Sequence, residues 1–125
     1  MYIANAGLFV KDLEGARKFF EDYFGAKVAF AYNEEENKYY SYIMDVGNGA
    51  RLELMTKPEI VDEKKEPNRT GYAHICIKLD SRTALDEVIA KVKADGCHIF
   101  YEPATTGGKE IRAVMFEDNV LEVCC

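Results

Sequence analysis

Hydrophobic and polar residues follow one order twice along this chain. In the first half, residues 2–10 are apolar and alternating, which predicts a strand. Asp12 can then cap a helix that ends at Gly25. The apolar residues of this helix share one face: Leu13, Ala16, Phe19, Phe20 and Tyr23. Three strands are predicted next, with NEEENK and GNG as the turns between them, at about 27–32, 39–46 and 51–56.

The same order begins again after residues 57–71, a charged and proline-containing stretch that is typical of a solvated connector. Residues 72–79 predict a strand, and Asp80 or Ser81 can cap a helix that Gly96 closes. The apolar face of this helix contains Leu85, Val88, Ile89 and Val92. PATTGG is predicted to be a flexible loop, too unlike a phosphate-binding loop to suggest a nucleotide site. The remaining strands are predicted at about 98–101, 110–117 and 120–125.

This repetition predicts an α+β fold of two tandem βαβββ modules, 1–56 and 72–125, joined by the linker 57–71. A module of about 55 residues buries too little surface to be stable alone. The copies should therefore pack together into one domain, 1–125, or exchange packing with a second chain. A pseudo-twofold axis would then place equivalent residues opposite each other, in a cleft surrounded by a curved mixed sheet. Because each sheet keeps an open edge, we expect a homodimer.

Composition and charge exclude several classes of protein. The chain is 48% hydrophobic and 30% charged, which is typical of a folded globule and not of a disordered chain. Its net charge of -6 leaves no basic surface for nucleic acid. No apolar run approaches the roughly 18 to 20 residues that span a bilayer, and the N-terminus has no basic region or cleavage site of a signal peptide. We therefore expect a cytoplasmic protein that binds neither nucleic acid nor membrane, with its four cysteines as reduced thiols.

Two glutamates stand in otherwise apolar strands, Glu53 in RLELM and Glu122 in NVLEVCC. When the first strands of the two copies are aligned, NAGLFV with HICIKL, Asn5 corresponds to His74. The separation from this position to the glutamate is then 48 residues in both copies (53 − 5 and 122 − 74). The four residues therefore form one constellation, to which each copy contributes one pair of equivalent positions.

Strand alternation predicts a common face for these four side chains. Each glutamate points away from its two apolar neighbours, which can pack on the helices. The opposite face then carries Asn5, Glu53, His74 and Glu122. Two carboxylates, an imidazole and an amide that converge there predict a site for a divalent cation. Taken singly, a strand glutamate is more often the solvent-facing half of the alternation, and a single histidine is more often a hydrogen-bonded core residue.

At these residues the sequence resembles the vicinal oxygen chelate superfamily, the group of glyoxalases, bleomycin resistance proteins and extradiol dioxygenases. The resemblance covers essentially the whole chain, through GLFVKDLEGARKFFEDYFGAKV, LEL, GYAHICIKLD and IRAVMFEDNVLEV. The ligand pattern is most similar to that of glyoxalase I (lactoylglutathione lyase), which is His or Gln, then Glu, His and Glu. Glu53, His74 and Glu122 match this pattern, and Asn5 stands at its first position.

The sequence departs from that family pattern in two places. An Asn amide oxygen can coordinate a metal as a Gln amide does, but its side chain is one methylene shorter. Asn5 would therefore bind through water or after a backbone shift, which could lower the affinity for metal. The turn before the last strand is shortened to EDN, where the family commonly has Asp-Pro-Asp-Gly. The extradiol dioxygenases are less similar, because they need a histidine at the first ligand position.

The resemblance implies a metal-dependent lyase or isomerase that acts on a small carbonyl-derived substrate, such as a glutathione hemithioacetal. A divalent metal, Ni(II) or Zn(II) before Mn(II) or Mg(II), would stabilise an enediolate while a carboxylate moves a proton between adjacent carbons. Glu122 is the expected base and also a metal ligand, with Glu53 as its pseudo-symmetric partner. The candidate cations for the carboxylates of glutathione are Arg51, Arg69 and Arg112.

Two other interpretations stay open from the sequence. The first is a metal-free binding protein of the bleomycin-resistance type, which sequesters a small hydrophobic or aromatic compound and keeps the ligand positions as a polar cluster. The second is a dimeric domain of unknown ligand, in which the acidic face is only solvated. Stoichiometric divalent metal is expected for the enzyme and not for the binding protein.

Overall fold

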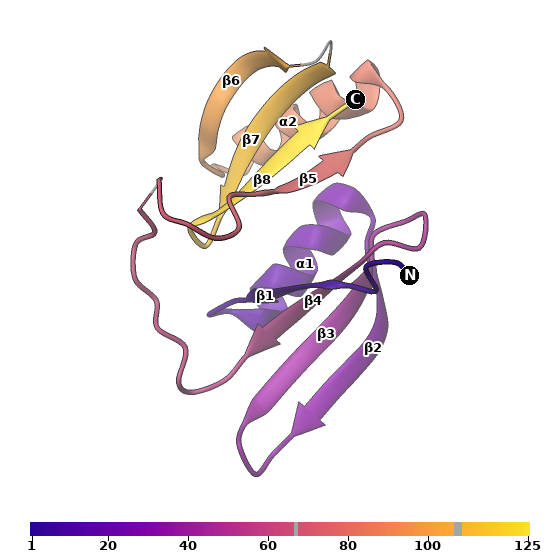
Figure 1. Ribbon diagram of the computed structural model, residues 1–125. Helices are drawn as coiled ribbons and strands as arrows, with labels where there is room; N and C mark the ends of the chain where they lie inside the picture. Colours follow the sequence, from indigo (N-terminus) through magenta and orange to yellow (C-terminus); the bar gives the residue numbers. More distant parts are fainter. Residues whose placement is uncertain (67, 107–108) are drawn as a thin grey trace. The chain divides into compact units, whose positions relative to one another are not determined.

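Strand, helix and three strands follow one another twice, as the sequence predicts. The fold is known from a computed structural model that describes residues 1–66, 68–106 and 109–125. The chain divides into two compact units, Met1–Asp62 (unit 1) and Glu63–Cys125 (unit 2). Unit 1 contains β1 (Ala6–Phe9), α1 (Leu13–Phe24), β2 (Lys27–Glu34), β3 (Tyr39–Asp45) and β4 (Arg51–Thr56). Unit 2 contains β5 (Ile75–Lys78), α2 (Arg82–Ala94), β6 (Ile99–Thr106), β7 (Lys109–Phe116) and β8 (Asn119–Cys124) (Figure 1). The predicted α+β class with two βαβββ modules is confirmed.

Each unit has its own mixed four-stranded sheet. The strand order is β1-β4-β3-β2 in unit 1 and β5-β8-β7-β6 in unit 2. The first strand of each unit runs parallel to the last one, and the other pairs are antiparallel. A parallel pair needs a crossover connection, which the helix supplies in both units. The strand that carries the glutamate is therefore the second strand of its sheet, between two hydrogen-bonded neighbours.

Helix α1 begins and ends where the sequence predicts. The Asp12 carboxylate accepts a hydrogen bond from the Gly15 backbone N–H at 2.9 Å, which caps the first turn. Gly25 stops the helix in the left-handed conformation, with φ 65°. The buried residues of α1 are Ala16, Phe19 and Phe20. They pack over β3 and β4, which α1 contacts, and this packing fixes one face of the sheet as the apolar face.

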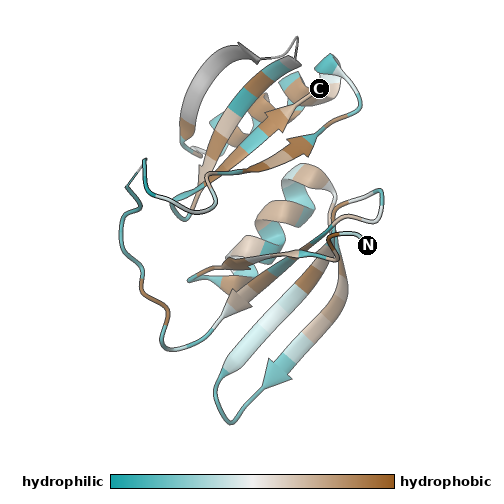
Figure 2. Cartoon of the chain, in the orientation of Figure 1, coloured by the Kyte–Doolittle hydropathy of each residue, from teal (hydrophilic) through white to brown (hydrophobic). Residues whose placement is uncertain are grey.

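Unit 2 is built in the same way, and the structure decides which of the two predicted residues caps its helix. Ser81, and not Asp80, caps α2, because the Ser81 hydroxyl accepts a hydrogen bond from the Ala84 N–H at 3.1 Å. In the described residues of this unit, the buried core comes from α2, β7 and β8. Its members are Leu85, Ile89, Val92, Ala113, Val114, Leu121, Val123 and Cys124. The second half of β7 is apolar (Figure 2), and the neighbouring residues Ala113 and Val114, which point to opposite faces of the sheet, are both buried.

Two predictions about strand ends were wrong. β1 begins at Ala6 and β5 at Ile75, so Asn5 and His74 lie just before their strands instead of inside them. The flexible loop predicted for PATTGG is a strand as far as Thr106, and residues 107–108 lie outside the described residues. β6 tolerates Pro103 because it is the edge strand, and its pairing with β7 is irregular between Tyr101 and Ala104.

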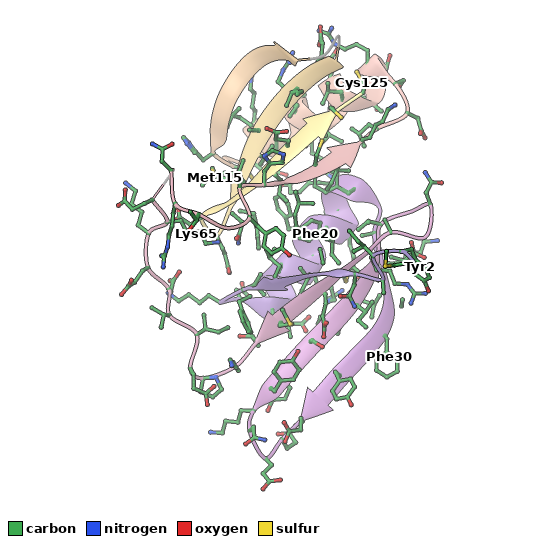
Figure 3. All side chains as sticks on the ribbon, viewed as in Figure 1. Tyr2, Phe20, Phe30, Lys65, Met115 and Cys125 are labelled. Atoms are coloured by element: carbon green, nitrogen blue, oxygen red, sulfur yellow. The ribbon has the colours of Figure 1, made fainter. Side chains whose placement is uncertain are left out.

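The middle of the predicted linker 57–71 is attached to both units. Asp62 forms an ion pair with Lys11 of unit 1 at 3.0 Å. Lys65, labelled in Figure 3, donates its backbone N–H to the Asp118 carboxylate at 2.7 Å and its ammonium group to Asn119. The boundary between the two units falls between these contacts. In the part of the chain that the structure describes, no helix is both long and apolar enough to cross a membrane.

Candidate metal site

The two glutamates occupy the same register in their sheets. Glu53 lies opposite Gly7 in the parallel pair of β1 and β4, and Glu122 lies opposite Cys76 in the parallel pair of β5 and β8. The offset is 46 residues in both units (53 − 7 and 122 − 76). Asn5 precedes Gly7 by two residues, as His74 precedes Cys76. The repeat inferred from the sequence is therefore a structural equivalence as well.

In unit 2 the structure brings His74 and Glu122 together. His74 Nε2 lies 3.3 Å from Glu122 Oε2, and the two side chains are 43% and 15% exposed. Two atoms that each lie about 2.0–2.2 Å from one cation are about 2.8–3.6 Å apart when the angle between them is about 90–109°. The observed separation suits two neighbouring ligands of one metal ion. An imidazole nitrogen and a carboxylate oxygen are also a common ligand pair for Zn(II) and Ni(II).

In unit 1 the carboxylate of Glu53 is held by two hydroxyl groups from β3. Ser41 Oγ donates to Glu53 Oε1 at 3.1 Å, and Tyr39 Oη donates to the same oxygen at 3.3 Å. Burial of the ring, and then the negative charge of Glu53, raise the pKa of the Tyr39 phenol. Tyr39 is therefore a neutral hydrogen-bond donor at neutral pH. In the described part of unit 1, Glu53 Oε2 accepts no hydrogen bond.

Asn5 is exposed and stands just before β1, where His74 stands in unit 2. No hydrogen bond joins it to Glu53 in the described part of the chain. Among the described residues there is also no group of three or more His, Cys, Asp or Glu side chains that could hold a metal ion. Each unit thus supplies two of the four predicted positions, and the direct contact is the one in unit 2.

A tight turn places Glu122 in its register. β7 ends at Phe116 and β8 begins at Asn119, so Glu117 and Asp118 alone connect them. Both have positive φ angles, 42° and 62°, as a two-residue hairpin of the I′ type requires. The shortened turn expected from EDN is therefore present. It sets the pairing of β7 with β8 so that Ala113 lies opposite Glu122.

The sequence analysis missed Ser41 and Tyr39. Ser41 is 2% exposed, although it is a polar residue in the predicted strand 39–46. Ser41 lies two residues from Ile43, the cross-strand partner of Glu53, and therefore on the same face of the sheet as Glu53. This position could have identified Ser41, but only if the register of β3 with β4 had been known. The choice of Arg112 as a candidate cation for the glutathione carboxylates was wrong. Arg112 pairs across the strands with the core residue Val123, on the face opposite Glu122, and its guanidinium lies 3.6 Å from the Glu110 carboxylate.

Comparisons with known proteins agree with this architecture. The Glyoxalase/Bleomycin resistance protein/Dioxygenase superfamily model matches residues 2–119. A glyoxylase/bleomycin resistance protein/dioxygenase domain from Frankia sp. EAN1pec has a TM-score of 0.83 at 15% identity, with 99% of this chain and 96% of that chain covered. The trypanothione-dependent glyoxalase I of Leishmania major has a TM-score of 0.78 at 23% identity, with coverage of 98% and 85%.

A fosfomycin resistance protein from Listeria monocytogenes is also similar in fold. Its structure contains Mn(II) and 1S,2S-dihydroxypropylphosphonic acid, and its TM-score is 0.76 at 18% identity, with 98% of this chain and 90% of that chain covered. At these identities the comparisons with solved structures show a shared fold. Among curated protein sequences, none matches this chain.

Proposed function

Because this chain belongs to the Glyoxalase/Bleomycin resistance protein/Dioxygenase superfamily, we propose that it is a metal-dependent lyase or isomerase of the glyoxalase type. Its substrate would be a small carbonyl-derived compound, such as a glutathione hemithioacetal. Asn5, Glu53, His74 and Glu122 would supply the protein ligands of one divalent metal. A homodimer is proposed as the assembly.

The observation that carries this proposal is the contact between His74 Nε2 and Glu122 Oε2 at 3.3 Å. It joins two ligand-type atoms at a separation that suits one metal ion. Unit 1 repeats the same register, and within the described residues the hydrogen bonds to the Glu53 carboxylate end on Oε1, which leaves Oε2 for a metal ion. A solvated acidic face would not require an imidazole beside one of its carboxylates.

A divalent cation bound to these residues would stabilise negative charge on the oxygens of the substrate. Glu122 would take a proton from the substrate carbon that bears hydroxyl and sulfur, and return it to the neighbouring carbonyl carbon. The hydroxyl proton would pass to the former carbonyl oxygen, so that no atom is lost and the hemithioacetal becomes a thioester of a hydroxy acid. His74 would act as a neutral ligand through Nε2, and Glu53 would remain a ligand throughout.

The metal and the substrate are supported by different arguments. Imidazole and carboxylate ligands favour Ni(II) or Zn(II), while the similar Listeria protein contains Mn(II). For glutathione, cationic groups are needed to bind its carboxylates, and Arg51 lies on the Glu53 face of β4 by alternation. Since Arg112 lies on the opposite face of its sheet, it is no longer a candidate for this role.

A second function is supported by Asn5. Its amide is a weaker ligand than imidazole and its side chain is short, and without metal the His74 imidazole can donate a hydrogen bond to Glu122 instead. The four positions would then form a polar cluster in a metal-free protein that binds a small hydrophobic or aromatic compound. The protein from Listeria shows that the fold also occurs among antibiotic resistance proteins.

The first test is the metal content of protein purified without added metal. About one divalent ion per chain is expected, and chelation should abolish isomerisation of the hemithioacetal of methylglyoxal and glutathione. Ni(II) or Zn(II) should restore it. A protein that binds no divalent metal in calorimetry, and that gains no turnover when metal is added, would support the metal-free binding protein and contradict the enzyme.

A further inference from the structure

Both hydrogen bonds to Glu53 end on one oxygen of its carboxylate. Ser41 Oγ and Tyr39 Oη donate to Oε1, at 3.1 and 3.3 Å. We infer that Ser41 and Tyr39 are positioning residues, which hold Oε1 and thereby direct Oε2 to the metal. This inference rests on the proposed function, because it assigns to these hydroxyl groups the orientation of a metal ligand.

The two donors are well placed to fix a carboxylate. Ser41 is almost completely buried, at 2% exposure, so its hydroxyl group is shielded from water as an alternative partner. Tyr39 is only half-buried, and its long side chain reaches the same oxygen from the beginning of β3. Tyr39 and Ser41 lie on the same face of β3. Together they restrict rotation of the Glu53 carboxylate about its Cγ–Cδ bond more than one donor would. A ligand that is fixed in this way loses less conformational entropy when metal binds.

The register shows that these donors are specific to unit 1. Ile43 lies opposite Glu53, and Ala113 lies opposite Glu122. Two residues before each of them stand Ser41 in unit 1 and Ile111 in unit 2. An isoleucine side chain cannot donate a hydrogen bond, so β7 does not repeat the Ser41 contact. Sheet packing alone therefore does not require a hydroxyl group at this position.

The test compares variants that remove one donor each, Ser41→Ala and Tyr39→Phe, and the double variant. Tyr40→Phe is the matched control, because it makes the same change one residue away and removes the hydrogen bond from Tyr40 to Glu35 instead. Ser41→Thr is the second control, because it keeps a hydroxyl group. A circular dichroism spectrum and a denaturation curve establish that each variant folds.

The first readout needs neither metal nor turnover. NMR relaxation of the Glu53 Cγ methylene in metal-free protein should show a lower order parameter in Ser41→Ala and Tyr39→Phe, and lowest in the double variant. Tyr40→Phe and Ser41→Thr should resemble the wild type. If Glu53 is equally ordered in all of these proteins, the two hydroxyl groups do not position it and the inference is wrong, whatever the function is.

The second readout is calorimetric titration with Ni(II) alone. The double variant should bind Ni(II) about ten- to a hundredfold more weakly than the wild type, as is typical when the partners of a metal ligand are removed. With metal in excess, kcat should change much less. Equal Ni(II) affinity of the double variant and Tyr40→Phe would overturn the inference while leaving the proposed function intact. A wild type that binds no metal would instead overturn the proposed function, and with it the metal-directing role.

Discussion

Units 1 and 2 pair their strands in the same register but surround their glutamates with different side chains. Glu53 lies opposite Gly7 and Ile43, and it accepts hydrogen bonds from Ser41 and Tyr39. In unit 2 the strand positions opposite the glutamate are Cys76 and Ala113, and His74 approaches its carboxylate.

This difference separates what the fold requires from what the site requires. The strand register and the buried leucine before each glutamate, which faces the helix, are common to both units. They therefore belong to the βαβββ architecture. The side chains on the opposite face are not common, so they are available for chemistry. Under the proposed function, Glu53 is the fixed ligand and Glu122 is the ligand that also moves a proton.

The largest effect is expected when the two glutamates are exchanged for glutamine one at a time. Glu122→Gln removes the base, so kcat should fall by about 10²- to 10⁴-fold while metal-free stability stays nearly unchanged. Glu53→Gln should instead weaken metal binding, with much of kcat recovered in excess metal. Steady-state kinetics over a range of Ni(II) concentrations distinguishes the two. Equal losses of kcat in both variants at saturating metal would show that the units share the proton transfer.

The buried leucines next to the glutamates test whether the two cores are equivalent. Leu52 and Leu121 occupy matched positions and are 4% and 1% exposed. Each leucine-to-alanine change should lower the free energy of unfolding by about 2–5 kcal/mol, because it leaves a cavity beside the helix. Urea denaturation followed by circular dichroism measures this. Val61→Ala, at a 74% exposed residue, is the control and should cost less than about 0.5 kcal/mol.

Asn5→His makes the first ligand position of unit 1 the same as that of unit 2. Because imidazole binds Ni(II) and Zn(II) better than an amide oxygen does, affinity for these metals should rise by about tenfold or more. Calorimetric titration measures it, and Asn5→Ala should move the affinity in the opposite direction. Unchanged affinity in both variants would place residue 5 outside the ligand set.

The smallest effect on stability is expected from the hydrogen bond between Tyr42 of β3 and Glu14 of α1. The Tyr42 hydroxyl, and then Arg17, lower the pKa of the Glu14 carboxyl. Glu14 therefore stabilises the fold above its ordinary pKa of 4.5, and this contribution is lost as the pH falls through its lower pKa in the folded state. Tyr42→Phe should raise the pKa of Glu14, which NMR titration measures. Since Glu14 is largely exposed, the effect on stability should stay below about 1 kcal/mol. In Tyr40→Phe the titration of Glu14 should be unchanged.

The sequence by itself determined the repeated fold and most of the candidate ligands. Helix caps, glycine stops and the change from helical to strand periodicity are local signals, so α1 was predicted to the residue. The correspondence of Glu53 with Glu122 also followed from spacing alone, because paired positions on the first and last strands are separated by the same number of residues in both copies.

Only the tertiary structure decided which neighbours surround these glutamates. The register of β3 with β4 brings the hydroxyl groups of Ser41 and Tyr39 to Glu53, and the pairing of β7 with β8 turns Arg112 to the face opposite Glu122. The strand at PATTGG also depends on tertiary pairing. Proline predicts a break in a strand from local propensity, but an edge strand tolerates it. Cross-strand contacts join residues that are distant along the chain, and local sequence patterns do not contain that information.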